Sequence, residues 1–230
     1  MSLITRQFKV SVFSWFILLA TVLSLFSCGN TTKKSYNEQG KLLSELSYND
    51  AGQLDGKSSW YYPDGTLQLE AWYKDGKMHG PQRRYFETGT VEEITFYHEN
   101  LKDSISTQYS LNSEKLTESY YVKDTLHGTY HRWYEGGSLA IEGSYTKGMM
   151  DGIWLFYDQA GLVIGKADYV QGKGVQKMYY PNGNPQRVIY YQNNMKHGPD
   201  EFYYPNGKLE KSILYENGLP VSETFDPAAK

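Results

Sequence analysis

The chain has 230 residues, of which 16% are aromatic, and Tyr and Gly each occur 22 times. Its formal net charge is -3 at pH 7, and acidic and basic residues are interspersed along its length. This distribution excludes the basic face of a nucleic-acid-binding protein, and the abundance of Tyr and Gly favours short strands and tight turns over a helical bundle or a disordered chain.

The first 27 residues have the pattern of an export signal. Arg6 and Lys9 precede an apolar segment, residues 10–26, which is too short with its flanks to be a comfortable spanning helix. We therefore predict a signal helix and lipoprotein signal peptide over residues 1–27, followed by a polar tether over residues 28–35. An uncleaved anchor or an ordinary secretory signal would export the chain equally.

Cys28 is the only cysteine of the sequence, and it directly follows Leu25, Phe26 and Ser27. This segment resembles the lipobox of bacterial lipoproteins, which implies cleavage before Cys28 and lipidation of its thiol. Buried acyl chains contribute about 0.8 kcal/mol per CH₂ group, so two or more chains hold a protein on a bilayer durably. The predicted membrane contact is therefore made through lipid on Cys28. Because the residue directly after Cys28 is not Asp, we expect the protein to be anchored in the outer membrane and to face the periplasm.

The rest of the chain repeats with a period of about 24 residues. Tyr residues mark this period at spacings of 22 to 25 residues: Tyr48, Tyr73, Tyr97, Tyr121, Tyr145, Tyr169, Tyr191 and Tyr215. Gly residues mark a second position of the period: Gly56, Gly80, Gly128, Gly152, Gly174 and Gly198. Turn sequences such as Pro181-Asn182-Gly183 mark a third position.

Each unit is predicted to form two antiparallel strands, because Asn-Gly and Asp-Gly supply the positive φ of a tight turn and Pro ends a strand. A unit of this size cannot bury its own apolar face, so successive hairpins must stack. The predicted fold is all-β, with about seven tandem hairpin repeats over residues 36–219 in one elongated, single-layer twisted sheet. Residues 220–230 are predicted to be a C-terminal tail.

One unit, between Tyr97 and Tyr121, departs from the pattern. The residues Asn100, Asp103 and Asn112 stand where Gly is expected. We therefore predict a weak point or a bend of the sheet in this unit.

The motif Gly-x-x-His-Gly, the turn aromatic-Tyr-Pro-Asn-Gly and the closing Tyr together resemble the variant MORN (membrane occupation and recognition nexus) repeat, over about residues 36–219. Proteins built this way include the YwqK-type antitoxins, named for the immunity half of a toxin–antitoxin pair. The resemblance implies an elongated antiparallel sheet used as a binding surface, and it implies no catalytic residue.

Residues that could carry chemistry recur with the repeat. Three of the five histidines precede the repeat Gly, at positions suited to capping a turn or packing on a ring: His79, His127 and His197. Carboxylates recur as well: Glu70, Glu118, Glu142 and Glu210. A metal site needs converging ligands, and catalysis needs one singular arrangement, so we predict no metal, no cofactor and no enzymatic activity.

The candidate binding surface is the column one residue before each repeat Tyr. Its large aromatic members, here called the aromatic stripe, are Trp72, Phe96, Tyr120 and Tyr190. Side chains alternate between the faces of a strand, so the stripe is expected to face away from the repeat Tyr. An exposed apolar row of this kind marks an interaction surface, although the rings could instead pack on neighbouring strands.

The predicted function is therefore a non-enzymatic, membrane-anchored scaffold that binds another protein in the cell envelope. Two alternatives remain open from the sequence. One is an antitoxin or immunity protein, which predicts a toxin gene beside this one. The other is a glycan or cell-wall binding module, because stacked aromatic repeats also occur in sugar-binding proteins.

Overall fold

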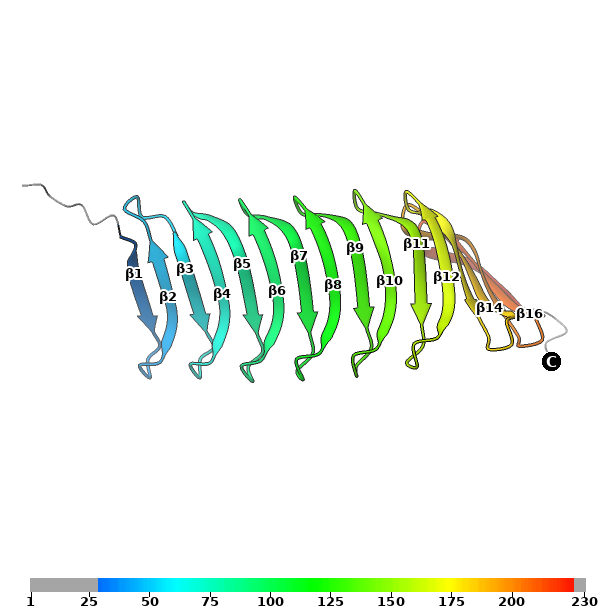
Figure 1. Cartoon of the computed structure of the whole chain (residues 1–230), viewed down its shortest axis with the longest axis horizontal. Helices are drawn as coiled ribbons and strands as arrows, with labels where there is room; N and C mark the ends of the chain where they lie inside the picture. Colours follow the sequence, from blue (N-terminus) through cyan, green and yellow to red (C-terminus); the bar gives the residue numbers. More distant parts are fainter. Residues whose placement is uncertain (1–28, 226–230) are drawn as a thin grey trace, which may run out of the picture.

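The computed structural model describes residues 29–225, so Cys28 and the segment predicted to be the signal lie outside it. It confirms the all-β fold: seventeen strands pair with their sequence neighbours, always antiparallel, in one open sheet (Figure 1). Among the described residues, no helix has the length and apolar character needed to cross a membrane.

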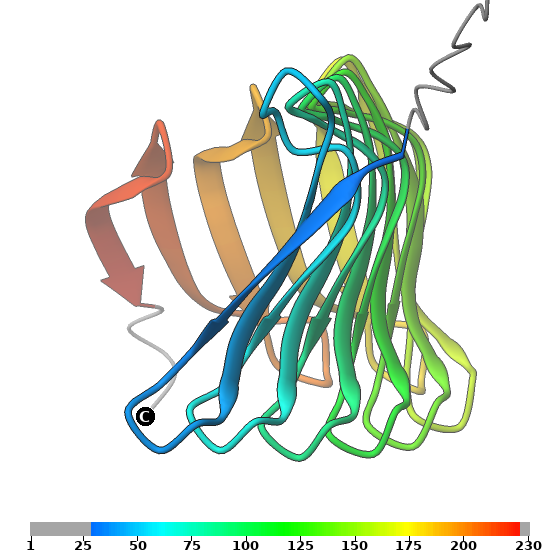
Figure 2. The same cartoon turned by 90° about the vertical axis from the view of Figure 1, so that its left-hand side faces the viewer.

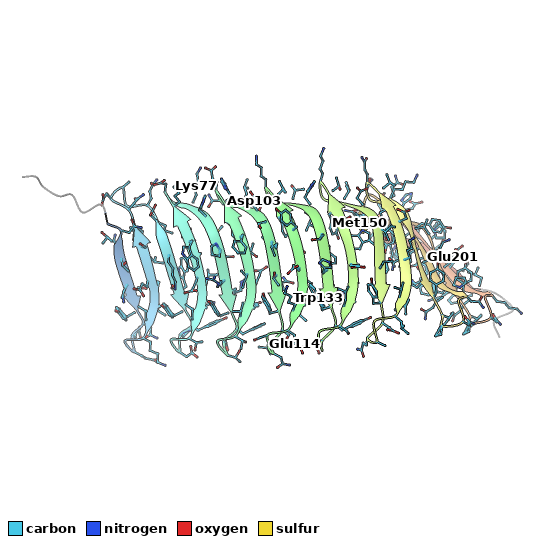
Figure 3. All side chains as sticks on the ribbon, viewed as in Figure 1. Lys77, Asp103, Glu114, Trp133, Met150 and Glu201 are labelled. Atoms are coloured by element: carbon cyan, nitrogen blue, oxygen red, sulfur yellow. The ribbon has the colours of Figure 1, made fainter. Side chains whose placement is uncertain are left out.

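The strands have the following bounds in chain order. They are β1 (Thr31–Tyr36), β2 (Leu42–Tyr48), β3 (Gly56–Tyr61), β4 (Leu67–Lys74), β5 (Lys77–Tyr85), β6 (Val91–His98), β7 (Leu101–Tyr109), β8 (Lys115–Val122), β9 (Thr125–Trp133), β10 (Leu139–Thr146), β11 (Met149–Tyr157), β12 (Val163–Val170), β13 (Lys173–Tyr179), β14 (Pro185–Gln192), β15 (Met195–Tyr203), β16 (Leu209–Glu216) and β17 (Leu219–Phe225). The hairpin turns form the two long edges of the sheet. Lys77 and Asp103 lie at one long edge and Glu114 lies at the other (Figure 3).

The sheet is longer than the repeat pattern indicated. β1 begins at Thr31, inside the segment expected to be a tether, and β17 ends at Phe225, inside the segment expected to be a tail. Both strands are exposed along their whole length. The sequence of β1 has no apolar alternation by which a strand could be recognised. β17 has Leu219, Val221 and Phe225 at alternate positions, but it follows the last repeat Tyr and so lies outside the repeat pattern.

The repeat Tyr residues share one face of the sheet, here called the tyrosine face. Each of these rings lies on an even-numbered strand, and six of the eight lie opposite the repeat Gly of the preceding strand, as Tyr145 does opposite Gly128. The other two, Tyr48 and Tyr121, lie opposite Thr31 and Ser104. Gly128 has a φ of 100°, which a residue with a Cβ adopts only at a cost. It lies next to a register shift that recurs between hairpins. The regular spacing of Tyr and Gly along the chain therefore reflects a β-bulge repeated along the sheet.

The sheet turns after β12, where β13–β17 swing to one side of the preceding strands (Figure 2). A weak point or a bend was predicted in the unit between Tyr97 and Tyr121. The bend lies elsewhere, so that part of the prediction is wrong, and the weak point stays a prediction. Ser104 there adopts the positive φ of the repeat Gly, at 84°, and keeps the bulge. By contrast, β12 and β13 pair without any register shift. The spacing of 22 residues between Tyr169 and Tyr191 has removed the bulge, so the regular hairpin there differs in geometry from its neighbours.

The cluster of buried hydrophobic residues lies on the tyrosine face beside this turn. Trp154, Ala167 and Tyr169 form the core cluster, at 4%, 1% and 2% exposure. The Trp154 ring packs edge-on against Tyr145 at 5.1 Å and against Tyr169 at 6.1 Å. Gly143 leaves space for this indole, because a Cβ there would lie 2.2 Å from the ring. An aromatic ladder thus replaces a two-layer core.

Candidate functional site

The aromatic stripe lies on the face opposite the repeat tyrosines. Phe96, Tyr120 and Tyr190 are 39%, 38% and 37% exposed, and Leu214 continues the column at 41%. Trp72 is half-buried. Three of the four predicted rings therefore present apolar surface to solvent, as an interaction surface requires.

The stripe is wider than the sequence indicated, because the residue opposite each member on the preceding strand is often apolar too. Strand register places Pro81 opposite Phe96 and Ile105 opposite Tyr120. Val175 and Pro199 stand in the same way opposite Tyr190 and Leu214. Sequence reasoning missed these partners because the bulges shift the register, so spacing along one strand does not reveal the residue across from it.

Polar residues divide the widened stripe at the turn of the sheet. Ser144 pairs with Thr129, and Asp168 pairs with the exposed Ile153. This leaves two apolar patches. The first patch consists of Pro81, Phe96, Ile105 and Tyr120, and the second consists of Val175, Tyr190, Pro199 and Leu214. The strands that carry the first patch, β5–β8, and those that carry the second, β13–β16, lie on the two sides of the bend in the sheet (Figure 2).

Trp72 stands at the N-terminal end of the stripe among charges. Lys57 and Arg83 lie 5.7 and 5.2 Å from its ring, within the range of cation–π contacts. Both cations also pair with Glu70, which accepts a hydrogen bond from the Tyr85 hydroxyl at 3.0 Å. Burial, together with this carboxylate, raises the pKa of Tyr85 above its usual value. Trp72 is thus held in a structural network and is the least available member of the stripe.

Two of the three repeat histidines bond to turns, and the third, His79, packs on the ring of His98 at 4.9 Å. The Nδ1 atoms of His127 and His197 accept hydrogen bonds from the backbone N–H of Lys147, at 3.3 Å, and of Asn217, at 3.5 Å. Each of these donors lies in the next turn along the sheet. Within residues 29–225, no group of three or more His, Cys, Asp or Glu residues is arranged to hold a metal ion.

Five segments of the chain match the family described as "MORN repeat variant": residues 31–50, 54–75, 78–99, 173–193 and 196–217. They coincide with the hairpins β1–β6 and β13–β16. MORN repeats are in general non-catalytic scaffolds that bind proteins or membranes. The hairpins β7–β12 lie outside the matched segments.

Comparison with other proteins adds little beyond this family. No curated protein matches the sequence. Among solved structures, a chain of the Tc holotoxin pore of Photorhabdus luminescens is 13% identical over 82% of this chain and 12% of its own length, with a TM-score of 0.22. A likeness this low supports no conclusion about function.

Proposed function

We propose that this MORN repeat protein is a non-enzymatic scaffold of the cell envelope, tethered to the outer membrane by lipid on Cys28 and binding a protein partner through the aromatic stripe. The observation that carries the proposal is the stripe itself. Its rings alternate with Ile, Val and Pro from the neighbouring strands, on the face that does not hold the aromatic core.

The composition of the two patches fits a protein partner. Aromatic side chains lose little conformational entropy on binding and are enriched among residues that dominate interface energies. The charged groups around Trp72 supply a polar rim beside the first patch. An open sheet of repeats offers these residues along an extended surface, which is the usual way in which repeat proteins bind.

The anchor is tested by replacing the predicted acceptor. Wild-type chain expressed in its native host should partition into detergent, and mass spectrometry should find acyl chains on Cys28. The variant Cys28→Ser should remain unacylated and should leave the membrane fraction. An unmodified Cys28 in the mature protein would contradict the anchor and leave the stripe untouched.

The stripe is tested by affinity capture from solubilised envelopes. The double variant Phe96→Ser and Tyr120→Ser should capture at least about tenfold less of the partner than the wild type does, because central aromatic residues dominate interface energies. Tyr179→Ser is the matched control, since Tyr179 is 37% exposed but lies outside the stripe. The proposal would be refuted if the double variant captured as much partner as Tyr179→Ser does, or if only glycans were captured. Capture of a toxin would identify the chain as an immunity protein acting through this surface.

A further inference from the structure

The tyrosine face contains a hollow where the sheet approaches its turn. Its volume is about 670 Å³, within the range of small-ligand sites. Six of its lining residues follow one another across the strands from β7 to β13, in a single row of the sheet: Gln108, Thr117, Arg132, Ile141, Phe156 and Met178. The hollow therefore lies almost wholly in the hairpins that do not match the family.

The floor of the hollow is apolar and tightly supported. Tyr130 lines it and stacks on Trp154 at 5.5 Å, with an angle of 28° between the ring planes. Gly165 separates Phe156 from Met178 in the row, and a Cβ at Gly165 would lie 2.3 Å from the Met178 sulfur. Met178 thus occupies the space that a side chain at this position would fill. The result is a continuous surface of aromatic, aliphatic and thioether groups.

Arg132 lies beside this floor, and its surroundings differ from those of the other arginines in the same row. Arg84 pairs with Glu93 at 3.4 Å, and Arg187 makes two hydrogen bonds to Asp200, at 2.7 and 2.8 Å. Within residues 29–225, Arg132 has no ion pair, and its cross-strand neighbours Thr117 and Ile141 are uncharged.

Gln108 adds neutral donors to the same end of the hollow. Its Oε1 atom accepts a hydrogen bond from the Thr117 hydroxyl at 2.9 Å, so the side-chain amide is oriented with its N–H groups away from Thr117. In the described part of the chain these N–H groups have no acceptor. One unpaired guanidinium and one free amide thus border an apolar floor, and Glu135 carries a negative charge at another part of the lining.

We propose that this hollow binds the C-terminal end of a peptide whose last side chain is apolar. The terminal carboxylate pairs with the Arg132 guanidinium, which can hold both of its oxygens at once. The last side chain lies on Tyr130, Ile141 and Phe156. Glu135 disfavours a second carboxylate, which selects peptides with one negative end over polyanions. The site is separate from the aromatic stripe, because it lies on the other face of the sheet.

The test measures the binding of a labelled pentapeptide ending in Ala-Leu to the full chain by fluorescence anisotropy. The free acid should bind at least about tenfold more tightly than the C-terminal amide, because the amide lacks the charge that Arg132 recognises. Arg132→Gln should abolish this difference, and Arg132→Lys should restore part of it by returning the charge without the two-point geometry.

Arg84→Gln is the matched control, since Arg84 is an exposed arginine of the same row outside the hollow. It should retain the full preference for the free acid, and circular dichroism should show the same fold for all the variants. The proposal is overturned by an absence of binding to the wild-type chain, by equal affinity for acid and amide, or by an equal loss in Arg84→Gln. None of these results bears on capture through the stripe, so the two proposals stand or fall separately.

Discussion

The strands β3–β8 and the strands β9–β15 use the same position on the tyrosine face in different ways. In β3–β8 the central row holds small residues apart from Gln82. Among the small ones are Ser58, Ala71, Thr95 and Ser106, which are at most 7% exposed. In β9–β15 the corresponding row contains Tyr130 and Trp154, and their rings join the repeat tyrosines in a ladder. One repeat therefore supports two kinds of core.

The difference shows what holds a single-layer sheet together. In β3–β8 the hydroxyls satisfy one another, as Thr95 and Ser106 do at 2.7 Å, and little apolar surface is buried by the row itself. Around the turn, each added ring removes far more apolar area from water, at about 25 cal/mol per Å². We infer that stability is concentrated at the turn, and that β3–β8 rely mainly on strand pairing.

The largest effect is expected from Trp154→Ala, which empties the centre of the ladder. Deleting a buried aromatic side chain costs about 3 to 5 kcal/mol, and Gly143 offers no side chain to refill the space. The matched change in β3–β8, Ser106→Ala, removes the hydroxyl that contacts Thr95 at 2.7 Å and Glu93 at 3.5 Å, and it should cost about 1 kcal/mol. Chemical denaturation measures both. Equal losses would refute the inference that stability is concentrated at the turn.

The next effect concerns the hairpin that lacks the bulge. A Cβ at Gly174 would lie 2.2 Å from the carbonyl oxygen of Asp168 and 2.6 Å from the Tyr169 ring. Gly174→Ala should therefore destabilise the chain by about 3 kcal/mol, since backbone must move to admit the methyl group. In the equivalent Gly152→Ala the methyl group would meet only Ser144 Oγ, at an ordinary contact distance of 3.6 Å, so the variant should lose only about 1 kcal/mol to its positive φ. Similar thermal shifts for the two variants would contradict this account.

The sequence predicted the repeat well and the turn poorly, and both outcomes have physical causes. Tyr, Gly and Pro-Asn-Gly mark hairpins because backbone geometry demands them. The spacing of 22 residues was visible, but its effect depends on a bulge that only strand pairing reveals. Likewise, the rings of the stripe could be placed by alternation along one strand. Placing Ile105 and Val175 beside them requires the pairing register between strands, which the sequence does not show. The hollow around Arg132 could not be predicted, because it depends on the curvature of the sheet. That Arg132 lacks an ion pair is also visible only in the structure, where Arg84 and Arg187 have acidic partners.

A moderate effect is expected at Asp200, a carboxylate 1% exposed in β15 that pairs with Arg187 and Lys196. Burial alone would raise the pKa of Asp200, but the hydrogen bonds from these two cations outweigh it and hold the pKa below its usual value. The charged pair therefore stabilises the fold above the unfolded pKa of about 4, and this contribution is lost as the pH falls through the folded value.

Asp200→Asn should accordingly cost about 2 kcal/mol near neutral pH, because it removes charge-assisted hydrogen bonds. The gap between variant and wild type should narrow as the pH is lowered below about 4. Urea midpoints measured across this range give the answer. A gap independent of pH would show that packing at Asp200, rather than its charge, stabilises β14–β16.

The smallest effect tests a contact that some repeats make and others lack. The Tyr134 hydroxyl donates to the carbonyl of Tyr157 at 2.7 Å, and Tyr62 and Tyr180 make the same bond to the next repeat at 2.8 Å. Phe86 occupies this position in another repeat and has no hydroxyl to donate. Tyr134→Phe should therefore cost about 1 kcal/mol.

The reciprocal change, Phe86→Tyr, should add the bond to the carbonyl of Tyr109 and stabilise β5–β8 by up to about 1 kcal/mol. The double variant Tyr134→Phe with Phe86→Tyr should then be nearly neutral, because the two sites lie in different repeats and share no partner. Thermal unfolding of the three variants checks this sum. If Phe86→Tyr destabilises the chain, β3–β8 depend on the apolar contacts of Phe86 more than on hydrogen bonding between repeats, and the contrast with the turn is weaker than we infer.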